Sequence, residues 1–299
     1  MDEATVAAVQ RMQDYIGEHL REEITLLQLA RAAGYSPYHC AHLFRQLTGK
    51  SPFEYIRLMR LSQAALTLRD TNEPVLDVAL DFVFDSHEGF TRAFTRAFGL
   101  PPARYRKSPP PIPLFIPYNV MAQALLKKHK EEPPMSENKL QPVFVQVIER
   151  PARKLLLKRA PSASEYFEYC AQVGCDVWPM LCSVKEALYE PVGLWLPKHL
   201  RTPGTGEYAQ GVELPSDRQV AVPEGYDLID LPACQMMIFQ GPPYDDQDFE
   251  SAVGSVQAFI NQFDPHLYGY DWAPESAPRF QLAPEGYRGY IEGRPVKAR

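Results

Sequence analysis

One pattern strongly constrains the fold of this chain, because it occurs twice in the first hundred residues: a short helix, a tight turn, a longer helix and a closing glycine. In the first copy, from 25 to 49, Thr25 and Gln28 have the spacing of a capping box that opens a helix. Ser36, one residue before a proline, predicts the start of the next helix. The second copy runs from 75 to 99. The first part of the chain is therefore predicted to fold as two similar helical units.

A long helix is predicted between the two copies. Ser51 precedes a proline and lies three residues before Glu54, which gives an N-cap, a first-turn proline and a capping box together. This helix should extend to about Arg69 and hold the copies at a fixed separation. In the second copy, Asp85 and Glu88 have the spacing of a further capping box, which would open the helix HEGFTRAFTRAF.

One residue breaks the equivalence of the two copies. Val83 lies at the turn of the second copy, where the first copy has Gly34. Glycine adopts positive φ freely, whereas a β-branched residue strongly disfavours it. Either the second turn takes a different conformation, or it holds Val83 under strain.

Two helix-turn-helix units in tandem favour DNA binding, because the second helix of such a unit enters the major groove. Two recognition helices joined by one rigid helix could read adjacent grooves, which lie about 34 Å apart. Residues from about 5 to 107 closely resemble the DNA-binding domain of the AraC/XylS family. The resemblance is carried by LARAAGYSPYHCAHLFRQLTGKSPFEYIRLMRLSQAALTLRDT and by VALDFVFDSHEGFTRAFTRAFGLPPARYR, which ends in a P-x-x-Y-R signature. It implies an all-α tandem helix-turn-helix domain of seven helices.

The resemblance also implies which side chains face DNA. Arg92 is the strongest candidate chemically, since arginine pairs with guanine through two hydrogen bonds. Glu88 could either cap its helix or accept from cytosine. The full set of implied base contacts is Tyr38, Ala41, His42, His87, Glu88 and Arg92. The implied phosphate contacts are Lys50, Arg57, Arg60 and Arg96, although an exposed arginine can equally belong to a solvated helix face.

Proline marks the end of the helical part. The stretch SPPPIPLFIP, residues 108–117, has five prolines in ten positions and cannot form a continuous helix or a central strand. A second break, EEPPMSENKLQP, covers 131–142. We therefore predict a DNA-binding domain over 1–108, a Pro-rich linker over 109–141 and a second domain over 142–299.

The second domain has a sequence pattern that is typical of an α+β fold. Segments of alternating polarity surround two helical stretches, in an order that predicts a duplicated β-α-β-β unit. This part resembles the GyrI-like effector-binding domain, on the stretches EYAQGVEL, MMIFQGPPYDD and LAPEGYRGYIEGRPV. The resemblance implies a pocket between the two halves that binds hydrophobic, often cationic, molecules.

Such a pocket needs flat apolar walls and an acidic group, because a cation stacks on aromatic faces and pairs with a carboxylate. Glu213 is the candidate acid, although it could also lie at a solvated strand end, and many of the aromatic candidates could be ordinary core. The candidate ligand-binding residues are Trp178, Trp195, Tyr208, Glu213, Phe239, Tyr268, Trp272 and Tyr287.

Two alternatives for the second domain stay open at this point: a hydrolase and a ligand-free protein-interaction module. The sequence has no G-x-S-x-G, H-E-x-x-H, P-loop or G-x-G-x-x-G motif, so we expect no enzyme, no metal site and no cofactor. A closed centre between the two halves would exclude both a ligand and a substrate.

The composition excludes some classes of protein but does not by itself identify a function. No apolar run approaches the ~20 residues of a membrane span, the first residues lack a signal-peptide pattern, and none of the five cysteines forms a C-x-x-C pair. A net charge of −6 does not by itself identify a DNA-binding protein. We expect a cytoplasmic, ligand-responsive transcription regulator whose partners are double-stranded promoter DNA, a small-molecule effector and RNA polymerase.

Overall fold

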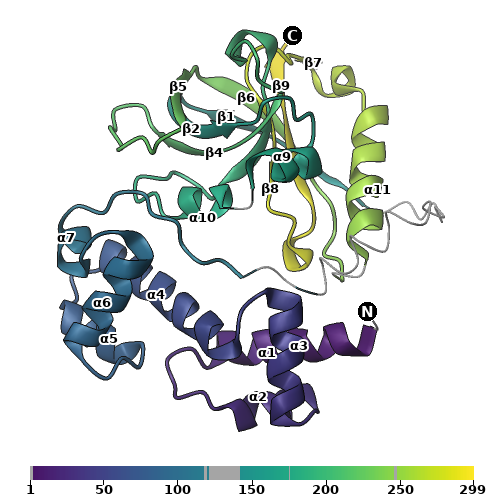
Figure 1. The fold of residues 1–299 in the computed structure, drawn as a ribbon. Coiled ribbons are helices and arrows are strands. Elements are labelled where there is room, and N and C mark those ends of the chain that lie inside the picture. Colours follow the sequence, from purple (N-terminus) through teal and green to yellow (C-terminus); the bar gives the residue numbers. More distant parts are fainter. Residues whose placement is uncertain (1–2, 118–119, 121–141, 175, 246–247) are drawn as a thin grey trace. The chain divides into compact units, whose positions relative to one another are not determined.

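The computed structural model describes residues 3–117, 120, 142–174, 176–245 and 248–299, which fall into two compact units (Figure 1). The helical unit lies within Met1–Pro133 and the sheet unit within Pro134–Arg299. No helix among the described residues combines the length and apolar character that crossing a membrane requires.

The helical unit contains two helix-turn-helix copies joined by a long helix. The predicted capping box is confirmed, since Thr25 accepts from the Gln28 N–H and the Gln28 side chain accepts from the Thr25 N–H. Ser36 and Ser51 likewise accept hydrogen bonds at the starts of the following helices. The helices are α1 (Glu3–Glu18), α2 (Leu26–Ala33), α3 (Pro37–Thr48), α4 (Pro52–Asp70), α5 (Val75–Asp81), α6 (His87–Phe98) and α7 (Pro102–Lys107).

Equivalent phenylalanines form the core of each copy. Phe44 on α3 is fully buried and its ring packs edge-on against Tyr55 of α4, with ring centroids 5.0 Å apart. Phe94 on α6 is also fully buried and packs against Phe98 at 4.7 Å and Tyr105 of α7 at 5.6 Å. Each recognition helix is thus fixed by an aromatic side chain on its inner face.

The two turns share one conformation despite their different residues. Gly34 has φ 78°, and Val83 has φ 60°, which makes it the only non-glycine residue with positive φ in the described part of the chain. The N–H of Phe84 donates to the carbonyl of Ala79, as that of Tyr35 does to Ala30, so both turns close their helix in the same way. Of the two outcomes that the sequence allowed, the structure shows strain at Val83.

Replacing Val83 with glycine should therefore stabilise the helical unit. The left-handed conformation costs a non-glycine residue about 1–2 kcal/mol, and glycine removes this cost. The gain in stability is smaller than this, because glycine also increases the entropy of the unfolded chain. We expect V83G to raise the free energy of unfolding by about 0.5–1 kcal/mol, measured by urea denaturation followed by circular dichroism. Gly34→Val is the matched control and should destabilise by a similar amount; an unchanged or lower stability of V83G would contradict the strain.

The first part of the predicted linker packs on the helical unit. Ile112 and Leu114 are buried, and the N–H of Phe115 donates to the hydroxyl of Ser62 on α4 at 2.7 Å. The Phe115 ring lies edge-on to Tyr55 at 5.0 Å. The rest of the predicted linker, residues 118–119 and 121–141, lies outside the described residues.

The sheet unit is a single antiparallel sheet with helices on one face. Its strands follow the order β1-β6-β9-β8-β3-β4-β2-β5, with β7 paired to β9. The strands are β1 (Phe144–Arg150), β2 (Arg153–Arg159), β3 (Val192–Trp195), β4 (Tyr208–Pro215), β5 (Asp227–Leu231), β6 (Cys234–Gln240), β7 (Tyr270–Trp272), β8 (Arg279–Leu282) and β9 (Ile291–Ala298). The helices are α9 (Tyr166–Val173), α10 (Val177–Cys182) and α11 (Phe249–Gln262).

Alternation along the strands separates the two faces of the sheet. Leu156 of β2 packs with residues of α9 and α10, whereas its neighbours Leu155 and Leu157 belong to the core on the opposite face. On β6, Phe239 packs under α11, and Ile238 belongs to the opposite core. The helices therefore cover one face, and this division decides which polar side chains can meet.

Candidate nucleic-acid interface and pocket

The first predicted recognition helix, α3, has one buried and one open face. Tyr38 is 87% exposed and His42 is also exposed, while Ala41 is half-buried. These three side chains lie on the open face, opposite the buried Cys40 and Phe44. The helix can thus offer a stacking or phosphate-binding tyrosine and a histidine, but Ala41 offers no hydrogen bond to a base.

The second predicted recognition helix, α6, is more polar. His87, Glu88 and Arg92 are all exposed, and none of them has a hydrogen-bond partner among the described residues. The predicted capping box that begins at Asp85 is wrong: the N-cap is Ser86, whose hydroxyl accepts from the Gly89 N–H at 3.0 Å. Because serine takes the cap one residue later than expected, Glu88 is left outside any capping box.

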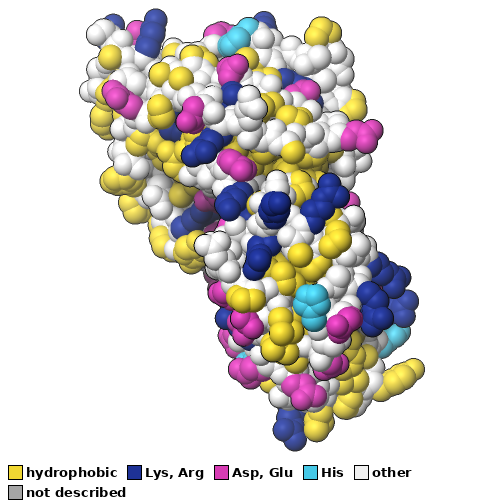
Figure 2. Space-filling model, turned by 90° about the vertical axis from the view of Figure 1, so that its left-hand side faces the viewer, with side chains coloured by type: hydrophobic (Ala, Val, Ile, Leu, Met, Phe, Trp, Pro, Cys, Tyr) yellow, Lys and Arg dark blue, Asp and Glu magenta, His cyan; other side chains and the backbone are white. Residues whose placement is uncertain are grey.

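Basic side chains border a hollow between α4 and α6. The hollow has a volume of about 450 Å³ and is lined by Arg57, Arg60 and Arg92 together with Ser86 at the α6 N-terminus. Arg57 and Arg92 are exposed, as is Arg96 one turn further along α6. In Figure 2, several Lys and Arg side chains gather at the right-hand edge of the lower part of the molecule, with Asp and Glu side chains elsewhere on the same face. This arrangement can bind a phosphate backbone on one side of the unit.

Two of the predicted phosphate contacts also have internal partners. The guanidinium of Arg60 donates to the carbonyl oxygens of Leu20 at 2.9 Å and Glu22 at 2.5 Å, and burial lowers its pKa. Lys50 lies 4.0 Å from Glu54 and above the ring of Phe115. Arg60 thus connects α4 to the segment that follows α1. The spacing of residues in the sequence did not predict this contact between distant segments.

The sheet unit has a pocket of about 450 Å³ on its helical face. Trp195 of β3 and Trp272 of β7 both line it, so the structure brings two of the predicted ligand-binding residues together. Its apolar wall also includes the prolines Pro197, Pro274 and Pro295. The remaining lining residues are Leu196 and the charged Arg201, Glu207, Glu275, Arg279 and Arg294.

The other predicted aromatic residues lie outside the lining. Tyr208 is buried beneath Trp195, with ring centroids 5.0 Å apart, and Phe239 is buried beneath α11. Tyr268 and Tyr287 are mostly exposed, and Trp178 on α10 is half-buried. Tyr208 and Phe239 thus support the pocket walls from behind.

The predicted acid, Glu213, is not in the pocket. It lies on β4 on the face opposite the helices, where Arg150 and Arg153 form ion pairs with its carboxylate, the latter at 2.8 Å. Its side chain is only 6% exposed. These two ion pairs and the low exposure favour a structural role for this carboxylate.

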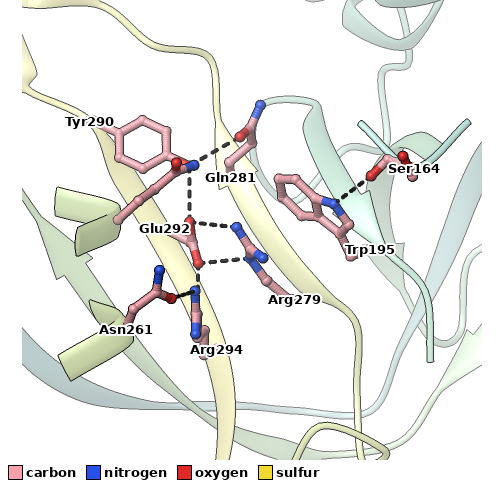
Figure 3. Close-up of polar contacts among 9 residues, drawn as sticks. Ser164, Trp195, Asn261, Arg279, Gln281, Tyr290, Glu292 and Arg294 are labelled. Atoms are coloured by element: carbon pink, nitrogen blue, oxygen red, sulfur yellow. Dashed lines mark hydrogen bonds and ion pairs between the residues drawn. The ribbon is translucent and has the colours of Figure 1, made fainter. Parts of the chain in front are cut away.

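A different acid, Glu292 of β9, contacts two of the lining arginines, Arg279 and Arg294 (Figure 3). Its fully buried carboxylate pairs with Arg279 at 2.7 and 3.0 Å and with Arg294 at 2.8 Å. The Tyr290 hydroxyl lies 3.0 Å from the same carboxylate. Burial, and after it the charge of Glu292, raises the pKa of Tyr290, so the phenol keeps its proton. The alternating Tyr290, Glu292 and Arg294 could have signalled a shared polar face in the sequence.

Trp195 is held rigidly at the pocket wall. Its indole N–H donates to the carbonyl of Ser164 at 3.0 Å, and the guanidinium of Arg279 lies 4.0 Å from the centre of its ring (Figure 3). Arg294 lies 6.0 Å from the ring centre of Trp272. The pocket therefore joins aromatic surface to guanidinium groups.

Comparison with known proteins matches the helical unit. A family described as a helix-turn-helix domain matches residues 29–108. The chain is 41% identical to the right origin-binding protein of Escherichia coli K12 over 109 residues, 36% of this chain and 37% of the relative. It is 36% identical to the regulatory protein SoxS of Salmonella typhimurium over 98 residues, 33% of this chain and 92% of the relative. The chain thus spans little more than a third of the first of these relatives and nearly all of the second.

Among solved structures, the chain is similar to the DNA-binding domain of AdpA, the global transcriptional factor, in complex with a target DNA. It is 30% identical, with a TM-score of 0.32, and the match covers 33% of this chain and 90% of that one.

Proposed function

Because this chain belongs to the AraC/XylS family of transcription regulators, we propose that it binds promoter DNA through α3 and α6 and changes transcription when the sheet unit binds a small molecule. The helical domain of this proposal covers 1–108, the linker 109–141 and the sensor 142–299. The sensor is an α+β domain of two similar halves, and its pocket lies near β3, β7, β8 and β9.

One observation carries the DNA-binding proposal: α3 and α6 expose polar faces while equivalent phenylalanines bury their inner faces. Phe44 and Phe94 are both fully buried, and Ser36 and Ser86 open the two helices in the same way. Helices held in this manner can enter successive major grooves with their N-terminal turns first. The free N–H groups of these turns also suit phosphate oxygens.

The exposed side chains divide into base-reading and phosphate-binding groups. Arg92 is exposed, and its guanidinium has no partner among the described residues, so it is free to pair with guanine. Glu88, outside a capping box, is available to a cytosine amino group. Tyr38, His42 and His87 complete the polar surface of the two helices, and Arg57 and Arg96 would hold phosphates. Lys50 and Arg60 would contribute less, because Glu54 and backbone carbonyls already engage them.

The pocket supports the sensing half of the proposal. A volume of about 450 Å³ lies within the range of small-molecule sites, and its walls combine two tryptophans with a few charged groups. Occupation of this pocket would change how the sheet unit acts on the helical unit or on RNA polymerase, and so alter transcription. A test compares transcription from a target promoter with and without a bound ligand; equal output would contradict the coupling.

DNA binding is tested by titrating the full chain on a library of promoter sequences at two salt concentrations. We expect the wild type to select a short sequence, and Arg92→Ala to lose about 1–3 kcal/mol at one base position. Arg96→Ala is the matched control: it should weaken binding to all sequences about equally and reduce the salt dependence by about one ion. A wild type without sequence preference, or an R92A variant with unchanged preference, would contradict these assignments.

A further inference from the structure

We propose that the pocket of the sheet unit selects a hydrophobic organic anion, an aromatic carboxylate, rather than the cation that its family resemblance implies. This inference rests on the sensing function proposed above and specifies the charge of the molecule sensed. The acidic group near the pocket, its arginine partners and the apolar wall each contribute one step.

The buried carboxylate that holds the two lining arginines is closed off from a ligand. Glu292 is fully buried, and its two oxygens accept hydrogen bonds or ion pairs from Arg279, Arg294 and Tyr290. Figure 3 shows these groups surrounding the carboxylate. A cation entering the pocket would have to displace a guanidinium to reach Glu292, and would then leave that guanidinium without its partner.

The groups that face the pocket are instead the arginines. The side chains of Arg279 and Arg294 are 30% and 22% exposed, and both line the cavity, whereas Glu292 does not. Arg279 donates a hydrogen bond from Nη2 to Glu292, and its buried Nε makes only an ion-pair contact with that carboxylate. Arg294 donates from Nε to Glu292 and from Nη2 to Asn261. Within the described residues, the Nη1 atoms of both arginines have no hydrogen-bond partner. These atoms remain available as donors to an oxyanion.

The charges of the side chains at this wall also favour a negatively charged ligand. Two guanidiniums share one carboxylate, which leaves one positive charge in excess at this wall. Of the other charged lining groups, Glu207 is balanced by Arg201 at 2.7 Å, whereas Glu275 adds one negative charge, but its side chain is 65% exposed to water. Because solvent screens the exposed Glu275 more than the partly buried arginines, an anion gains Coulomb energy at the wall formed by Arg279 and Arg294.

The apolar lining residues form a surface that fits a flat aromatic ring. Trp195 and Trp272 present aromatic surface, and Pro197, Pro274 and Pro295 add rigid apolar contacts. The indole of Trp195 is fixed by Ser164 and stacked by Arg279, so this surface is preformed. A ring placed against the tryptophans would bring its carboxylate to Arg279 and Arg294, as charge-assisted hydrogen bonds require.

Three probes of one shape and different charge test this inference: 2-naphthoate, 2-naphthylmethanol and 2-naphthylmethylammonium. Each is titrated into the full chain at pH 7 by calorimetry, with tryptophan fluorescence as a second signal. We expect naphthoate to bind at least about tenfold more tightly than the ammonium, with the alcohol between them, and the preference to shrink at high salt. Arg294→Gln should weaken naphthoate binding by about tenfold and leave the alcohol nearly unchanged.

Two further variants guard against a trivial loss of folding. Arg159→Gln removes an arginine of the sheet unit that lies outside the pocket lining and pairs with Asp227 at 2.6 Å, and should change naphthoate affinity less than twofold. Glu292→Gln removes the competing carboxylate and should tighten naphthoate binding. Tighter binding of the ammonium than of naphthoate would overturn the anion assignment while leaving small-molecule sensing intact. Binding of none of the three probes by the native chain would overturn both.

Discussion

Replacing Phe94 with alanine is expected to lower the free energy of unfolding of the helical unit by about 3–5 kcal/mol and to abolish DNA binding by the full chain. Phe94 is fully buried, and its ring contacts those of Phe90, Phe98 and Tyr105. The cavity left by alanine would lie between α6 and α7, where no neighbouring backbone can collapse into it without moving the recognition helix. The loss comes close to the whole stability of a small domain.

The position of the tryptophans makes this loss measurable in the intact protein. All three, Trp178, Trp195 and Trp272, belong to the sheet unit, so their fluorescence follows its unfolding alone. Urea denaturation of F94A should show an early loss of helical circular dichroism with an unchanged fluorescence transition. Anisotropy of a labelled operator should show no binding at concentrations that saturate the wild type.

Phe53→Ala is the matched control, since it removes the same side chain from a position that is 54% exposed. Its free energy of unfolding should change by less than about 0.5 kcal/mol. If F94A unfolds at the same urea concentration as the wild type, Phe94 does not anchor the second copy, and the tandem arrangement loses its structural basis.

Local signals in the sequence predicted much of the helical unit. The caps at Thr25, Ser36 and Ser51 depend only on residues within one turn, so the pattern of side chains was sufficient to locate them. At the second recognition helix the same rule chose Asp85 over Ser86, because both residue types cap helices and the spacing to Glu88 favoured the first. In the structure Ser86 caps the helix one residue later, and Phe84 just before it packs against Phe90 with ring centroids 5.0 Å apart.

The polar groups of the sheet unit could not be placed in the same way. Glu213 and Glu292 both occur in strands that contain a glycine, and nothing local indicates which face of the sheet each occupies. That face follows from long-range register: Glu213 lies opposite Leu155 of β2, on the side away from the helices, whereas Glu292 lies opposite Gln281 of β8 on the helical side. A shift of one residue in either pairing would have exchanged their roles.

The second large change in stability is expected when the buried ion pairs around Glu213 are broken. Glu213→Ala is expected to lower the free energy of unfolding of the sheet unit by about 3–5 kcal/mol, because it leaves two arginine charges in the core without a counter-charge. The side chains of Arg150 and Arg153 are only 10% and 3% exposed. Arg150 also lies above the rings of Tyr189 and Phe280, so its guanidinium cannot turn toward water without disrupting this packing.

Glu207→Ala isolates the contribution of burial, since the Arg201–Glu207 pair has the same chemistry and a 2.7 Å separation but side chains that are 33% and 38% exposed. An exposed pair contributes at most about 1 kcal/mol, so E207A should shift the tryptophan fluorescence transition in urea only slightly, whereas E213A should shift it strongly. Equal shifts for the two variants would mean that water reaches Arg150 and Arg153 in the folded state. Glu213 would then be accessible from solvent, and its assignment as a structural acid, rather than a ligand-binding one, would be wrong.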